Sequence, residues 1–179
     1  MTTISKKNHA DYSDFNDFTS RDDTFEMLLM SYESLCEDQR DWVCNLSNAA
    51  SLLWHAYKSL NVEVIWAGFY TVRSGKPSEL LLGPFQGKVA CQSIPFGQGV
   101  CGTAADSKET QLVSDVSKFS GHIACDGETK SEIVVPIVST DGKTLGVIDL
   151  DCGDFNGFGE SDKIHLEKLA KLIAKTCDF

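Results

Sequence analysis

The chain has 179 residues, a length that favours a single domain. Its 16 basic and 26 acidic residues give a formal net charge of −10. Nucleic acids and anionic membranes require a basic surface, so we expect neither as a partner. No apolar stretch is long enough to span a bilayer, and residues 1–19 are polar and acidic. We therefore expect a cytoplasmic protein, small enough to enter the nucleus as well.

The seven cysteines are the unusual feature of this composition. A chain of this length can bury enough apolar surface to fold without disulfide bonds, which are rare in reducing compartments. Structural zinc sites use closely spaced pairs such as C-x₂-C, and the sequence contains none. Buried packing and thiol chemistry remain as the two explanations.

Two helices are predicted in the first third of the chain. Ser20 and Asp23 resemble a capping box, followed by an apolar period of three or four residues over positions 25–35. A second amphipathic helix is predicted over residues 40–60. We expect Asn61 to end it in the left-handed conformation.

The middle of the chain changes to short apolar runs with period two, which predict β-strands. Asp141 and Gly142 mark a tight hairpin, and a short helix is predicted over residues 100–106. The predicted strands cover residues 63–72, 79–85, 89–96, 110–113, 132–139 and 144–152.

A last amphipathic helix is predicted over residues 160–177, capped by Ser161. Helices, a run of strands and a final helix together predict an α+β fold. We expect a central antiparallel sheet of about six strands with the N- and C-terminal helices packed on one face. Residues 1–20 have no sustained period and are expected to form a flexible arm before one domain over residues 21–179. The predicted buried stripe of the last helix is Ile164, Leu169, Leu172 and Ile173.

Some cysteines are better candidates for chemistry than others. Cys125 lies in a polar loop, where a thiol is reachable. His122 could help to ionise it, whereas Asp126 and Glu128 would raise its pKa, so an inert surface cysteine remains an alternative. Cys44 and Cys177 are predicted to be buried packing residues, while no role is assigned to Cys36 and Cys152.

Carboxylates form a second constellation. Asp149 and Asp151 share one face of the last strand, and Glu132 begins the strand across the hairpin. Such acids suit an ammonium ligand, or a carboxylic acid of raised pKa that donates a proton. The alternative is a strand end with solvated acids.

Aromatic residues form a third. Trp66 and Tyr70 share a strand face. Core packing is the commoner fate of such residues. The alternative is the wall of a pocket for a small cation, in which Gly68 leaves room for the ligand.

Residues 97–102 match the dinucleotide-binding pattern G-x-G-x-x-G. The following predicted helix is too short for a crossover connection, and position 122, about 20 residues on, is His122 instead of an acid. We therefore interpret these glycines as a tight turn.

Longer stretches resemble the free methionine-(R)-sulfoxide reductases, single GAF domains that reduce the free amino acid, and are most similar to fungal members. The resemblance covers about residues 25–177. It lies in WAGFY (66–70), GPFQGKVAC (83–91), FGQGVCGTAA (96–105), GHIACDGETKSEIVVPI (121–137) and LGVIDLD (145–151).

This resemblance implies a GAF fold and a set of site residues. It implies Cys125 as the nucleophile, Cys91 as the resolving cysteine and Cys101 as an auxiliary redox residue. It also implies free methionine-(R)-sulfoxide as substrate, thioredoxin as reductant, no metal and no organic cofactor; a homodimer would be common for the fold. The implied substrate-binding residues are Trp66, Tyr70, Glu132, Asp149 and Asp151.

Two other classes of protein remain as alternatives. A non-catalytic GAF sensor would bind a small ligand or nucleotide without reducing it. A plain redox sensor would form a disulfide with peroxide without turning over a sulfoxide. Turnover of free methionine-(R)-sulfoxide separates both from the enzyme.

Overall fold

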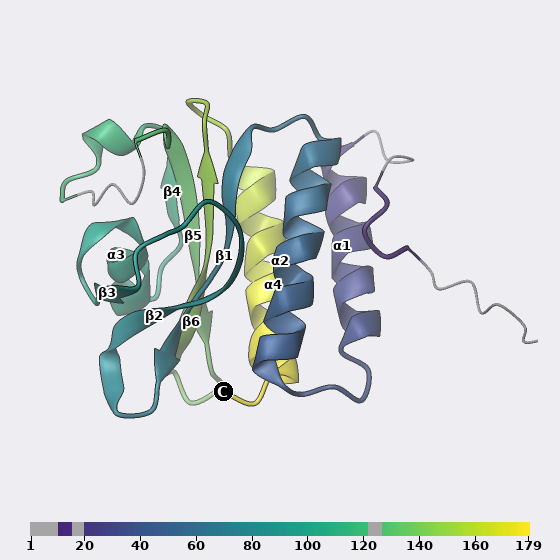
Figure 1. Ribbon diagram of the computed structural model, residues 1–179, viewed down its shortest axis with the longest axis horizontal. Helices are drawn as coiled ribbons and strands as arrows, with labels where there is room; N and C mark the ends of the chain where they lie inside the picture. The colour runs from purple at the N-terminus through teal and green to yellow at the C-terminus, as the bar shows by residue number, and fades with distance from the viewer. Residues whose placement is uncertain (1–10, 16–19, 122–126) are drawn as a thin grey trace, which may run out of the picture.

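The structure is a computed structural model that describes residues 11–15, 20–121 and 127–179 (Figure 1). A six-stranded sheet separates a thick helical layer from a thinner one that holds the short helix α3 (Gly99–Ser107) and the 3₁₀ helix η1 (Val116–Lys118). None of the described helices is both long and apolar enough to cross a membrane. The predicted α+β class, with N- and C-terminal helices on one face of the sheet, is confirmed. The helices of the thick layer are α1 (Arg21–Leu35), α2 (Trp42–Ser59) and α4 (Glu160–Thr176).

The sheet has the strand order β3-β2-β1-β6-β5-β4, and all neighbours are antiparallel. Residues 89–92, predicted as the start of a strand, lie outside it. Val89 there is 88% exposed, so its apolar side chain marks no buried face. The strands are β1 (Val64–Arg73), β2 (Lys76–Gly87), β3 (Ser93–Pro95), β4 (Gln111–Val113), β5 (Ser131–Val138) and β6 (Thr144–Cys152).

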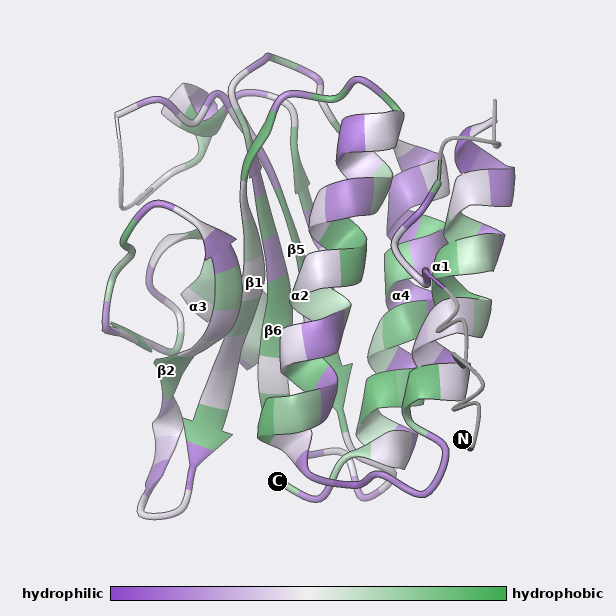
Figure 2. Cartoon of the chain, turned by 45° about the vertical axis from the view of Figure 1, so that its right-hand side comes forward, coloured by the Kyte–Doolittle hydropathy of each residue, from purple (hydrophilic) through white to green (hydrophobic). Residues whose placement is uncertain are grey.

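Each face of the sheet has its own apolar core. Successive side chains of a strand point to opposite faces, so β1 and β6 supply residues to both cores and are largely hydrophobic (Figure 2). The larger core lies under α1, α2 and α4 and includes Phe25, Tyr32, Tyr57, Phe69 and Ile148. The smaller core lies under α3 and includes Trp66, Tyr70, Val100, Cys101 and Val147.

Several predicted turns and caps are confirmed. The Ser20 hydroxyl accepts a hydrogen bond of 3.1 Å from the Asp23 N–H at the start of α1. Asn61 follows α2 with a φ of 55°, and Gly142 turns the β5–β6 hairpin with a φ of 81°. The predicted arm lies mostly outside the described residues, although Phe15 packs into the larger core.

Helix α4 begins differently from the prediction. Its N-cap is Gly159 instead of Ser161, and the Gly159 N–H donates to the Asp162 carboxylate at 2.7 Å. Asp162 is completely buried, where it pairs with Arg21 and accepts a hydrogen bond of 2.8 Å from the Tyr57 hydroxyl. The buried Asp162 carboxylate therefore fixes the first turn of this helix through its bonds to Arg21, Tyr57 and Gly159.

The buried face of α4 is consequently offset from the predicted stripe. Leu169 and Ile173 are buried as predicted, but Ile164 is 47% exposed. Asp162 and His165 occupy the buried face instead. Because both are polar, a stripe assigned from apolar residues alone misses them.

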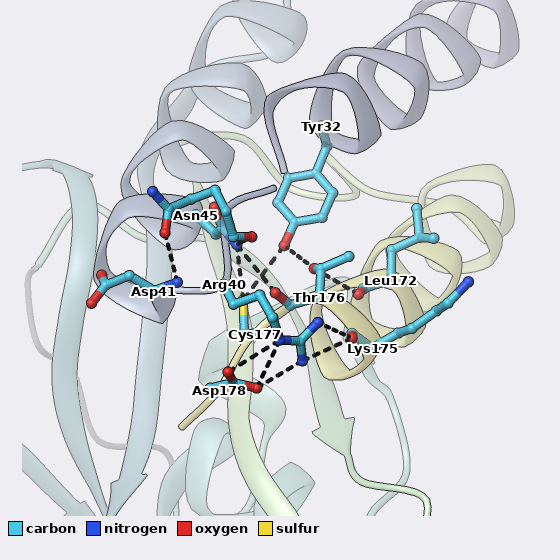
Figure 3. Close-up of polar contacts among 10 residues, drawn as sticks. Tyr32, Arg40, Asp41, Asn45, Leu172, Lys175, Thr176, Cys177 and Asp178 are labelled. Carbon is cyan, nitrogen blue, oxygen red and sulfur yellow. Dashed lines mark hydrogen bonds and ion pairs between the residues drawn. The ribbon is translucent and has the colours of Figure 1, made fainter. Parts of the chain in front are cut away.

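The residues after α4 lie against the turn between α1 and α2 (Figure 3). Arg40 donates to both carboxylate oxygens of Asp178, at 2.7 to 3.1 Å. Cys177 is buried, as predicted, with its sulfur 3.7 Å from the Tyr32 hydroxyl. Cys44, also predicted to be buried, is exposed on α2.

Candidate active site

Strand pairing brings the predicted acids and aromatic residues to one face of the sheet. Asp151 on β6 is paired with Glu132 on β5 and with Trp66 on β1. Asp149, two residues earlier on β6, is paired with Gly68. Directly paired residues of antiparallel strands place their side chains on the same face. The three acids therefore share the face that α3 covers with Trp66 and Tyr70 of β1.

Helix α3 adds Cys101 to this group. The Cys101 sulfur lies 4.0 Å from Glu132 Oε1, and Cys101 is only 5% exposed. Glycines on both sides of Cys101 allow α3 to approach the sheet this closely. Gly99 has a φ of 61°, and a Cβ on Gly102 would lie 2.3 Å from the Pro95 carbonyl oxygen. The G-x-G-x-x-G segment is thus a tight turn against the sheet, as predicted.

Asp149 is the most electrostatically perturbed acid of the site. Burial raises its pKa to about 7, although a hydrogen bond with Cys101 opposes the shift. Its Oδ1 has no hydrogen-bond partner among the described residues. Glu132 is also buried, at 6% exposed, whereas Asp151 is half-buried. The alternative of solvated acids is therefore wrong for Asp149 and Glu132.

The Cys101 thiol lies in a strongly anionic environment. Burial raises its pKa well above the usual value, and the negative charges of Asp149 and Glu132 raise it further. Cys101 is therefore a buried, neutral thiol. Cys125, by contrast, is predicted from the sequence to lie in a loop where a thiol is reachable. Its sulfur, a Glu132 oxygen and an Asp149 oxygen all lie within 4.8 Å of one another, and together they could hold a metal ion.

Aromatic rings form one wall of the site. Trp66 stacks on Tyr70, with ring centroids 5.7 Å apart, and on Phe85 at 5.2 Å. The buried Trp66 Nε1 has no hydrogen-bond partner in the described part of the chain. Phe85 is missing from the predicted site residues, although it lies on β2, the strand that pairs with β1.

Gly68 has a different role from the one that the pocket-wall alternative gives it. A Cβ at this position would lie 2.3 Å from the Phe85 Cβ. The space at Gly68 is therefore occupied by β2 and is not left for a ligand. Because residue 68 has no side chain, the Phe85 ring can stack on Trp66.

The predicted redox cysteines differ in their surroundings. Cys91 follows β2, is half-buried and is disulfide-bonded. Cys101 is a buried free thiol. Cys125, the predicted nucleophile, and His122 lie outside the described residues. The other cysteines are free, with Cys44 exposed and Cys36, Cys152 and Cys177 buried.

Known proteins resemble this chain over most of its length. A family model described as the GAF domain matches residues 48–176. A free methionine-R-sulfoxide reductase of Saccharomyces cerevisiae is 64% identical, over 96% of this chain and 95% of its own length. One from Escherichia coli is 38% identical, over 83% of this chain and 85% of its own length. The structure of the Neisseria meningitidis free methionine-R-sulfoxide reductase in complex with its substrate has a TM-score of 0.82 and 40% identity, and the match covers 89% of this chain and 92% of that one.

Proposed function

Since the chain belongs to the GAF-domain family of free methionine-(R)-sulfoxide reductases, we propose that it reduces free methionine-(R)-sulfoxide to methionine. The observation that carries this proposal is a pair of buried polar atoms without partners among the described residues. These are Asp149 Oδ1 and Trp66 Nε1, on the face of the sheet beneath α3. Buried polar atoms need hydrogen-bond partners, and a polar ligand enclosed beside them would supply these.

The chemistry of the surrounding side chains fits this substrate. Glu132 and Asp151 are carboxylates suited to a substrate ammonium group. The stacked rings of Trp66, Tyr70 and Phe85 offer an apolar surface to a short thioether chain. A small zwitterion with a methylthio end satisfies both parts of the site.

Reduction begins with the Cys125 thiolate, which attacks the sulfoxide sulfur. The sulfur–oxygen bond breaks as the oxygen passes to the cysteine, so that methionine leaves and Cys125 becomes a sulfenic acid. The Cys91 thiol then attacks the Cys125 sulfur, and water is released as the disulfide forms. A thioredoxin-type dithiol reduces this disulfide by thiol exchange. The sequence of steps requires no metal and no organic cofactor.

Asp149 is the proton donor that we assign to the sulfoxide oxygen. The oxygen must accept protons as its bond to sulfur breaks. A carboxyl group with a pKa of about 7 holds its proton in the neutral range, in contrast to an ordinary aspartate. The Asp149 Oδ1, which has no partner in the described part of the chain, is the atom available for this contact.

The state of the cysteines supports the assigned redox pair. Cys91 is disulfide-bonded, whereas Cys36, Cys44, Cys101, Cys152 and Cys177 are free. A resolving cysteine has to form a disulfide during each turnover, and Cys101 lies buried among acids instead. We therefore assign resolution to Cys91 and an auxiliary role to Cys101.

A single-turnover experiment tests this sequence of steps. Reduced protein is mixed with excess free methionine-(R)-sulfoxide without a reductant, and methionine and protein thiols are counted. We expect one methionine per chain, a new disulfide in the wild type and a sulfenic acid trapped by dimedone on Cys125 in the Cys91→Ser variant. Methionine formation by Cys125→Ser at the wild-type level would contradict the assignment.

A further inference from the structure

Three metal-ligating side chains meet at the floor of the site from three separate elements. Cys101 comes from α3, Glu132 from β5 and Asp149 from β6. One ligand atom of each lies within 4.8 Å of the other two, and the Cys101 sulfur lies 4.0 Å from Glu132 Oε1. All three residues are at least nine-tenths buried. The packing of α3 against β5 and β6 therefore determines where these three side chains lie.

A second observation indicates that this group has a ligand still to bind. Asp149 is 5% exposed, yet its Oδ1 has no hydrogen-bond partner in the described part of the chain. No basic side chain among the described residues forms an ion pair with Asp149. A cation bound here would give the unpartnered Oδ1 a ligand bond and would stabilise the deprotonated form of the buried carboxyl group.

The donor set selects the kind of cation. Magnesium and calcium take oxygen ligands, whereas zinc accepts one thiolate together with carboxylates. In a tetrahedral zinc site with ordinary bond lengths, a sulfur and an oxygen ligand lie about 3.6 Å apart. The observed 4.0 Å between Cys101 and Glu132 therefore needs only a small contraction.

We propose that Cys101, Glu132 and Asp149 form a Zn²⁺-binding site. The Cys101 thiol gives up its proton to coordinate the ion, and the fourth position is open to water.

Zinc bound there also competes with methionine sulfoxide. This second statement rests on the proposed function, since Glu132 and Asp149 are the acids assigned to the substrate. The ion would occupy the place of the substrate ammonium and sulfoxide groups. Zinc and substrate therefore exclude each other, and zinc regulates the enzyme by blocking the site.

The test uses the oxidised full-length protein, in which Cys91 is held in its disulfide and Cys101 is free. Metal-free protein is titrated with Co²⁺, whose thiolate complexes absorb in the near ultraviolet, and the bound Co²⁺ is then displaced with Zn²⁺. We expect one ion per chain and a thiolate charge-transfer band. Cys101→Ser should abolish the band, and Asp149→Asn should weaken metal binding at least tenfold.

Cys44→Ser is the matched control, because Cys44 is a free thiol on the surface. It should leave the band and the affinity unchanged. A band that persists in Cys101→Ser, or that disappears in Cys44→Ser, would overturn the site. Circular dichroism of each variant separates loss of binding from loss of folding, and a folded Asp149→Asn protein with wild-type affinity would also overturn it.

Competition is measured on the same oxidised protein, without turnover. Saturating free methionine-(R)-sulfoxide should weaken Co²⁺ binding at least tenfold, and an unchanged affinity would overturn the competition. Turnover by the reduced enzyme is measured separately. Metal binding without turnover would contradict the proposed function alone, and turnover without metal binding would contradict this inference alone.

Discussion

The Cys101 sulfur lies 4.0 Å from a carboxylate oxygen of Glu132, 31 positions further along the chain. This contact joins α3 to β5 on the face of the sheet that carries the smaller core. Asp149, from β6, completes the group at its floor. A thiol and two carboxyl groups in a common buried space make the pKa of each depend on the others.

The rate of methionine formation should depend on the protonation of Asp149. Its pKa of about 7 means that the acid form is lost as pH rises through neutrality. In single-turnover measurements from pH 5 to 9, the wild-type rate should therefore have a limb that falls above about pH 7. Asp149→Asn should reduce the rate about 10²–10⁴-fold and remove this limb. Asp154→Asn, at an exposed acid just after β6, serves as the control and should retain the wild-type profile. An unchanged limb in Asp149→Asn would exclude Asp149 as the donor.

Asp149 should also influence stability with a definite sign. Its pKa is about 7 in the folded chain and about 3.9 in an unfolded one, so the folded state binds more protons between these values. The contribution of Asp149 is thus most favourable at low pH and is lost as pH rises towards 7. Relative to the wild type, Asp149→Asn should gain on the order of 3 kcal/mol in unfolding free energy between pH 4 and pH 8. Urea unfolding of both proteins at pH 4 and pH 8 measures this gain. If the difference in unfolding free energy between the two proteins were the same at both pH values, the raised pKa of Asp149 would be contradicted.

The acids should make the enzyme selective for a substrate with a free ammonium group. N-acetylmethionine-(R)-sulfoxide lacks the charge-assisted hydrogen bonds that an ammonium group would donate to Glu132 and Asp151, and each such bond contributes about 1.5–3 kcal/mol. We expect kcat/KM to fall at least ~100-fold. The methyl ester of unacetylated methionine-(R)-sulfoxide keeps its ammonium group and is the matched control. Equal rates with the free and N-acetylated substrates would contradict the assigned role of the acids.

The Asp162 network should be important for stability. Asp162 is fully buried and pairs with Arg21, Tyr57 and the N–H of Gly159. Asp162→Ala leaves the Tyr57 hydroxyl and the Gly159 N–H without their acceptor and removes the ion pair with the partly exposed Arg21, so it should lower the unfolding free energy by roughly 2–4 kcal/mol. The exposed Arg40–Asp178 pair is the control, and Asp178→Ala should change stability little. If Asp162→Ala and Asp178→Ala lowered the unfolding free energy by similar amounts, the burial of Asp162 would not explain its contribution to stability.

Local patterns predicted the elements of this fold well. Alternating apolar residues identified the strands that carry the site, and Asn61 and Gly142 marked turns by their backbone preferences. The hairpin between β5 and β6 then determined that Glu132 would lie opposite Asp151. Short-range periodicity and one turn therefore sufficed to bring the acids together.

Features that depend on distant contacts could not be predicted in this way. The buried face of α4 is defined by Asp162, whose partner Arg21 lies on another helix. The closeness of Phe85 to Trp66 depends on how β2 pairs with β1 across Gly68. The contact between Cys101 and Glu132 depends on the path of the chain around α3. None of these partners follows from spacing along the sequence.

The most direct test of the account is thioredoxin-coupled turnover of the two epimers of free methionine sulfoxide. The assay compares the wild type with Cys125→Ser, and with Cys44→Ser as a control at an exposed thiol. We predict turnover of the R epimer by the wild type and Cys44→Ser, none by Cys125→Ser, and none of the S epimer by any of them. R-epimer turnover by Cys125→Ser at the wild-type rate, or no turnover by the wild type, would contradict it.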